Sequence, residues 1–433
     1  MSPSIEGIIA AAVLLIALFI GMPVGFAILT AGFVGMSLVV SPQAAIGFVS
    51  LDIFEKFSSY PLSAVLMFVL MGYYAEMTGM TTRFFRIAYV WLGSVRGGLS
   101  VATVASCALF AAVCGSSAAT VATVGKVAYP EMKKYNYDDA LATGCIAGAG
   151  TLGPLIPPST GLVIYALLAE QSIAQMLVSG IIPGILLAII MALTVYIICW
   201  RNPNLGPPGP PSSWKEKIEV LPGLIEAAGL FIFVIGGLFF GLFTPTQAGS
   251  AGCIGALIIG FIHRKITRQK LWSATKEGLK VSCMIFFLIT GSIIFGHFLS
   301  MSTLSLTFVE WAKQLPIPPI GLFLLLAAFY IIAGCFVDAM GLLVLSVPIV
   351  IPVFFDLGFD PVWFGLMVCI ITETGVLTPP VGVNVYVIKA IVPEVPLQKI
   401  FAGVMPFLAA MLVCIALLIL FPILVTWLPS MVH

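Results

Sequence analysis

Hydroxyl side chains gather in three short segments of an otherwise apolar chain. Sodium takes oxygen ligands, so hydroxyls beside freed backbone carbonyls could form cation sites inside a membrane. For any single serine or threonine, the alternative is a hydrogen bond to a carbonyl of its own helix. The hydroxyls are those of Ser116, Ser117 and Thr120, those of Thr151, Ser159 and Thr160, and those of Thr372, Thr374 and Thr378.

Paired prolines interrupt two of the apolar stretches next to these hydroxyls. Pro157-Pro158 follows the segment Gly150 to Pro154, and Pro379-Pro380 follows Thr372 to Gly375. A proline has no amide donor and its ring clashes one turn back, so a continuous helix cannot pass through either pair. Irregular backbone is tolerated at membrane depth only where it lines a cavity or is buried in protein. Each pair therefore predicts a broken helix, the alternative being a kink that serves packing alone.

Two acidic residues, Asp338 and Glu373, stand in apolar surroundings far from any predicted surface. An ionisable group at such depth is a candidate for function. We expect Asp338 to belong to a sodium or substrate site, whereas Glu373 could instead cap a helix or carry a proton. For Lys126 we expect snorkelling toward an interface, and for His297 a contact between helices.

The composition requires lipid as the solvent for this chain. Charged residues are 9% of the 433 and apolar residues 61%, with a mean hydropathy of +1.16. Ile8 to Val40, Val220 to Phe243 and Phe401 to Trp427 are long enough to cross a bilayer. The start of the chain lacks the basic region of a signal peptide, so we expect the first span to be retained.

Several classes of function are disfavoured by the same sequence. A net charge of +1 argues against nucleic acid as a partner. The nine cysteines stand singly in apolar stretches, which predicts small buried hydrophobes rather than metal ligands. No P-loop motif and no nucleophile with a base at catalytic spacing is present, so we expect neither a primary pump nor an enzyme.

The two halves of the chain repeat each other at an offset of 222 residues. At this offset Asp138 aligns with Asp360, the two proline pairs coincide, and Ser116 meets Asp338. The predicted organisation is a first repeat at 1–205 with a hairpin at 98–135 and a broken helix at 138–170, a cytoplasmic linker at 206–222, and a second repeat at 223–433 with a hairpin at 319–356 and a broken helix at 361–392.

Positive charge predicts the orientation of the two copies. The basic loop His263 to Lys270 and the cations flanking the first hairpin indicate the cytoplasmic side, which leaves the second hairpin opening outward. The expected fold is an all-α polytopic membrane protein, an inverted repeat with about ten spanning helices, two re-entrant hairpins and two broken helices. Paired broken helices in an inverted repeat are typical of secondary transporters.

Five segments in order resemble the large membrane subunit of the tripartite ATP-independent periplasmic (TRAP) transporters: GSSAATVATVG, GTLGPLIPPST, FTPTQAG, FVDAMGLLVLSVPIVIPV and GVLTPPVGVNVYV. The resemblance covers nearly the whole chain. It implies an elevator-type, sodium-coupled importer of a small organic anion, of the C4-dicarboxylate or sialic acid type, in a bacterial inner membrane. It also implies a periplasmic binding protein that delivers the substrate and a small four-helix membrane subunit. A stand-alone sodium/dicarboxylate carrier is the alternative.

The resemblance further implies two groups of site residues. Sodium ligands would be Ser116, Ser117, Gly150, Thr151 and Gly153 in the first repeat, and Asp338, Thr374, Gly375 and Thr378 in the second. The substrate would contact Ser116, Thr120, Ser159, Thr160, Pro379, Pro380 and Asn384. Lys126 departs from the small or polar residue expected in the first hairpin.

Overall fold

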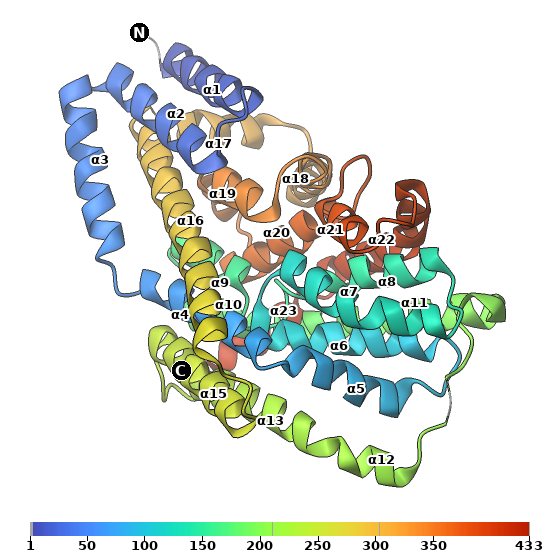
Figure 1. Cartoon of the computed structure of the whole chain (residues 1–433). Coiled ribbons are helices and arrows are strands. Elements are labelled where there is room, and N and C mark those ends of the chain that lie inside the picture. Colours follow the sequence, from blue (N-terminus) through green and yellow to red (C-terminus); the bar gives the residue numbers. More distant parts are fainter. Residues whose placement is uncertain (1–2, 210, 303, 433) are drawn as a thin grey trace.

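A computed structural model describes residues 3–209, 211–302 and 304–432, and all regular elements in these ranges are helical (Figure 1). Six helical segments are long and apolar enough to span a membrane by length and composition. They are Ile173–Arg201 (α10 and α11), Trp214–Phe239 (α12 to α14), Pro245–Ile262 (α15), Arg268–Met301 (α16), Ala339–Asp356 (α19) and Leu397–Leu420 (α22).

Two bent pairs raise the number of candidate spans to eight. Pro42–Phe57 (α3) meets Leu62–Met77 (α4) at 51°, and α17 (Leu304–Gln314) meets α18 (Pro319–Gly334) at 118°. About ten spans were expected from the sequence. Shorter apolar helices such as α2 (Val24–Val39) fall below the length of a full span, which accounts for the lower count.

The apolar stretch from Ile8 to Val40 forms two helices rather than one span. α1 (Pro3–Phe19) ends before Gly21, whose φ of +82° lies in the left-handed region, and Pro23 precedes α2. Glycine adopts this conformation without the clash that a Cβ would cause, so the chain can turn here. α1 and α2 then pack against each other.

The hairpins and broken helices have matching boundaries in the two halves. The first hairpin is α6 (Gly98–Cys114) with α7 (Ser117–Lys134), followed by α8 (Asp139–Gly150) and α9 (Thr160–Leu168). In the second half α18 and α19 are followed by α20 (Pro361–Gly375) and α21 (Val383–Ile391). The residues that cap α8 and α20 are Asp138 and Asp360, and both accept backbone N–H bonds. Capping by an aspartate thus starts the broken helix at the equivalent position in each half.

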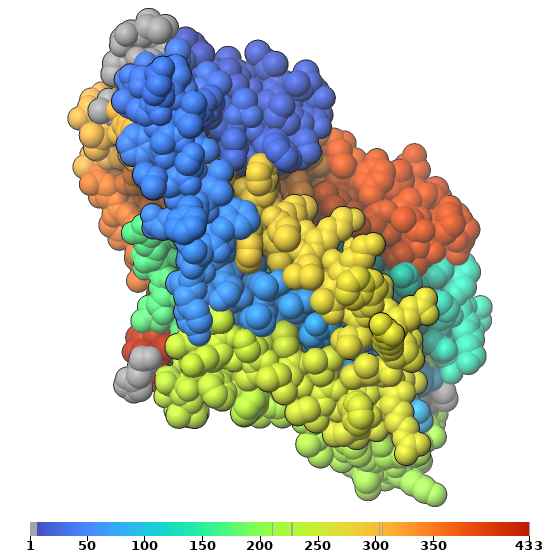
Figure 2. Space-filling model, turned by 60° about the vertical axis from the view of Figure 1, so that its left-hand side comes forward, coloured from blue at the N-terminus to red at the C-terminus, as the bar shows by residue number. Residues whose placement is uncertain are grey.

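Elements from the two halves pack together around these hairpins. α8 contacts α22, and α21 contacts both α7 and α8. The long helix α16 contacts α2, α3, α4 and α19, and it crosses the molecule between these groups (Figure 1). On the face drawn in Figure 2, the yellow surface of α16 lies between the blue segments of the N-terminal helices and the orange and red segments of the second half.

The expected linker at 206–222 contains a helix. α12 (Trp214–Glu219) begins with a capping box, in which the Ser213 hydroxyl accepts from the Glu216 amide and the Glu216 carboxylate accepts from the Ser213 amide. The Lys217 ammonium lies 5.6 Å from the ring centroid of Trp91 on α5 (Met80–Leu92). The segment is therefore partly ordered by local capping and by contact with α5, which a composition rich in proline and glycine does not predict.

Candidate functional site

The tip of the first hairpin rests on the backbone of the first helix break. Gly115 ends α6 with φ of +67°, and its carbonyl accepts a hydrogen bond of 2.9 Å from the Thr160 hydroxyl. A Cβ placed on Gly153 would lie 2.6 Å from the carbonyl oxygen of Ser116, so only glycine permits this approach. The structure therefore brings Gly153 close to Ser116, and a Cβ on Gly150 would lie 3.3 Å from the Ser117 carbonyl oxygen.

The second hairpin meets the second break in the same way. A Cβ built on Gly334 of α18 would lie 2.9 Å from the Cα of Gly375. After the break, the Gly382 amide donates to the Cys335 carbonyl at 3.4 Å. Thr378 and Gly375 thus lie beside the end of α18, with Asp338 three residues beyond Cys335 at the start of α19.

Most of the predicted hydroxyls donate to backbone carbonyls nearby. Thr120 donates to the Ser116 carbonyl at 2.7 Å, and Thr151 to the Gly148 carbonyl at 2.7 Å. Ser159 donates to Pro154 and accepts from the Leu162 amide at 3.1 Å. Thr372, Thr374 and Thr378 each donate to the carbonyl four residues earlier. These hydroxyls therefore donate their hydrogens locally, which is the alternative that the sequence left open for each of them. Only their oxygen lone pairs remain to bind a ligand.

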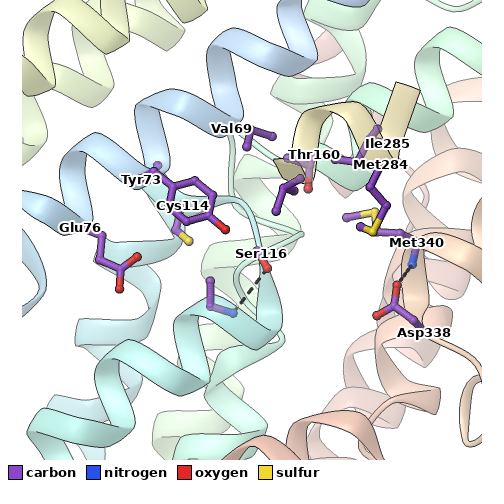
Figure 3. A pocket seen from close by; sticks show the side chains of 13 residues that line it. Val69, Tyr73, Glu76, Cys114, Ser116, Thr160, Met284, Ile285, Asp338 and Met340 are labelled. Carbon is purple, nitrogen blue, oxygen red and sulfur yellow. Dashed lines mark hydrogen bonds between the residues drawn. The ribbon is translucent and has the colours of Figure 1, made fainter. Parts of the chain in front are cut away.

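A pocket of about 210 Å³ lies between the two hairpin tips and the helices α4 and α16 (Figure 3). Its polar side chains come from four elements: Ser116, Thr160, Asp338, and Tyr73 with Glu76 on α4. Its apolar wall is made by Val69, Gly72, Cys114, Ala119, Val281, Met284, Ile285 and Met340. Because its residues come from far apart in the chain, the pocket exists only in the folded protein.

Asp338, which we expected far from any predicted membrane surface, lies at this pocket beside the tip of the second hairpin. Its side chain is exposed at this pocket, where it caps α19 by accepting the Met340 amide at 3.1 Å (Figure 3). A capping residue at a hairpin tip points away from its helix, so it faces the cavity instead of the core.

Glu373, by contrast, is buried with 3% of its surface exposed. Its Oε1 accepts from the Ser117 hydroxyl at 3.5 Å, which joins the first hairpin to the broken helix of the second half. Among the described residues no group donates to its Oε2. A buried carboxylate oxygen without a donor is unusual and leaves room for a cation or a proton.

Of the residues expected to contact substrate, only Ser116 and Thr160 line the pocket. Thr120 and Ser159 are buried outside the pocket lining, and Pro379 and Pro380 are exposed outside it. Asn384 is buried, and its amide donates to the Ala147 carbonyl of α8 at 3.5 Å, so it connects the two halves.

Sequence reasoning missed the contribution of α4. Tyr73 and Glu76 line the pocket, and Glu76 could have been noticed as an acid in the apolar helix Leu62–Met77. Outside the pocket, His297 Nδ1 contacts Asp52 Oδ2 at 2.9 Å, so it joins α16 to α3 as expected. Lys126 is exposed.

A family model and the curated relatives agree on one family, and a solved structure shares its fold. A family model described as "Tripartite ATP-independent periplasmic transporter, DctM component" matches residues 11–424. The C4-dicarboxylate TRAP transporter large permease protein DctM of Pseudomonas aeruginosa is 32% identical, over 91% of this chain and 90% of that protein. The sialic acid TRAP transporter large permease protein SiaM of Vibrio cholerae is 30% identical over 96% of each chain. The crystal structure of the Alcanivorax borkumensis YdaH transporter shares the fold, with a TM-score of 0.66 at 15% identity over 89% of each chain.

Proposed function

Because this chain belongs to the DctM family of TRAP transporter large permeases, we propose that it is a sodium-coupled importer of a small organic acid. The family comprises multi-pass membrane permeases rather than enzymes, and it implies a periplasmic binding protein and a small membrane subunit. Two relatives are named for C4-dicarboxylate and sialic acid transport, which supports a carboxylate-bearing substrate. The proposed location is the bacterial inner membrane, and the proposed small subunit has four helices.

The observation that supports sodium coupling is the contact of each hairpin with a helix break. Gly153 approaches Ser116 in the first half, and Gly375 approaches Gly334 in the second. Such breaks free backbone carbonyls, which coordinate sodium in transporters with inverted repeats. The proposed sodium sites use Ser116, Ser117, Gly150, Thr151 and Gly153 in one half, and Asp338, Thr374, Gly375 and Thr378 in the other.

The proposed movement is an elevator, in which the hairpins and broken helices move together against the remaining helices. Contacts of α21 with α7 and α8 support one moving unit that includes parts of both halves. The pocket lies between that unit and the helices α4 and α16, where a substrate would be held during the movement. We further propose that the two halves have opposite orientations in the membrane, which follows from the distribution of positive charge.

Uptake into proteoliposomes tests the coupling. A ligand screen of the cognate binding protein first identifies the substrate, and this chain is then reconstituted with its small subunit. Uptake should rise steeply with external sodium and stop when the sodium gradient is dissipated, whatever the proton gradient. Uptake that is indifferent to sodium would contradict the proposal, and uptake without the binding protein would favour a stand-alone carrier.

A further inference from the structure

The carboxylate of Glu76 stands on the wall of the pocket formed by α4, across from the hairpin tips. Glu76 and Tyr73 occupy the α4 side in Figure 3, and Asp338 lies on the other side beyond Ser116 and Thr160. The pocket therefore has one carboxylate on each of two facing walls. These walls belong to different bodies in the proposed movement.

No basic side chain balances Glu76. Within the described residues, its one hydrogen-bond donor is the Thr123 hydroxyl of α7, at 3.0 Å from Oε1, and it forms no salt bridge. The described pocket lining contains no lysine, arginine or histidine. A carboxylate that is partly removed from water without a cation is costly, and a second anion beside it adds repulsion.

We propose that the substrate carries a cationic group in addition to its carboxylate, and that Glu76 is the residue that selects for this group. This inference rests on the proposed function and narrows its substrate class to small zwitterions. The proposed sodium sites lie at the hairpin tips beside Asp338 and Glu373, where the ions offset those two acids. Glu76 lies on the opposite wall and has no such counterion.

The arrangement also assigns a direction to the bound substrate. Its carboxylate faces the hairpin tips, where the N-terminus of α7 at Ser116 and the proposed sodium ions favour negative charge. Its ammonium or related cationic group faces Glu76 on α4. A pocket of about 210 Å³ is below the roughly 300–1,000 Å³ typical of drug-sized ligands, which suits a molecule of a few carbons.

Two four-carbon probes that differ at one end test the assignment. Succinate carries two carboxylates, whereas 4-aminobutyrate carries one carboxylate and one ammonium group. The purified complex of this chain with its small subunit is titrated with each probe, with and without sodium, and apparent affinities are obtained from the thermal unfolding midpoint. In sodium, 4-aminobutyrate should bind more tightly than succinate.

The variant Glu76→Gln keeps an acceptor for Thr123 but removes the charge. It should weaken the binding of 4-aminobutyrate by roughly 10-fold or more, because a charge-assisted hydrogen bond is lost. The affinity for succinate should stay unchanged or increase. The control Thr123→Val removes the contact between α4 and α7 and should keep the preference for 4-aminobutyrate.

Three results would overturn the role of Glu76. The first is tighter binding of succinate than of 4-aminobutyrate by the wild type, and the second is no binding of either probe in sodium. The third is an equal loss of affinity for both probes in Glu76→Gln, which would make Glu76 a sodium ligand or a structural residue. A failure of the proposed sodium coupling gives a different result, because both probes would then bind equally well with and without sodium. The ratio of the two apparent affinities would still test the role of Glu76.

Discussion

Gly144 of α8 and Gly403 of α22 face each other with no space for a side chain. A Cβ on Gly144 would overlap the carbonyl group of Gly403, and a Cβ on Gly403 would overlap the carbonyl group of Ala140. The two helices come from different halves of the chain, so this crossing joins the first broken helix to the second half.

Gly403→Ala should therefore lower stability. The added methyl group forces α8 and α22 apart, and such overpacking typically lowers the free energy of unfolding by about 1–3 kcal/mol. Thermal unfolding of the purified protein in detergent measures the change. Gly47→Ala is the matched control, since a Cβ on Gly47 in α3 meets nothing within 4 Å. An unchanged midpoint for Gly403→Ala would contradict the close crossing.

Gly115→Ala should reduce sodium-driven uptake more than it reduces stability. The new Cβ would lie 2.5 Å from the Pro158 carbonyl oxygen and would push the hairpin tip away from the break. Gly79→Ala separates this clash from backbone strain, because Gly79 has φ of +73° but open space around its Cβ. Similar uptake by the two variants, normalised to the amount of folded protein, would show that the tip contact is not required.

Asp338→Asn and Ser117→Ala should raise the sodium concentration needed for half-maximal uptake by roughly 10-fold, because each removes an oxygen ligand or its charge from a proposed site. Sodium titrations of uptake in proteoliposomes provide the measurement. Ser37→Ala serves as the control, since that hydroxyl on α2 donates to the Phe33 carbonyl outside the site. Wild-type sodium dependence in both variants would remove these residues from the sites.

His297→Leu should destabilise the contact between α3 and α16. Asp52 is 6% exposed, and its Oδ2 would lose the partner that lies 2.9 Å away, at a cost of about 1–3 kcal/mol. The double variant Asp52→Asn with His297→Leu should recover part of the loss, because a neutral amide is less costly to bury than a charge. Equal midpoints for the single variant and the wild type would indicate that the contact contributes nothing to stability.

Local signals in the sequence predicted the two broken helices at the centre of the molecule. The proline pairs lie in the breaks that follow α8 and α20, and the aligned residues Asp138 and Asp360 cap the starts of these helices. Capping and proline act within one turn of the chain, so they can be read without knowledge of the fold. The same reasoning did not find α12, whose capping box lies in a segment that composition marks as a linker.

By itself, the sequence determined that this chain lies in a membrane, that its halves repeat, and that hydroxyls and glycines gather at two breaks. The tertiary structure decided which of these residues face a common pocket. It placed Asp338 at that pocket and Asn384 away from it, and it added Glu76 from α4, a helix outside the hairpins and the two proline breaks. The physical reason is that composition and spacing reflect solvent and local backbone geometry, whereas the lining of a pocket depends on how helices distant in sequence pack together.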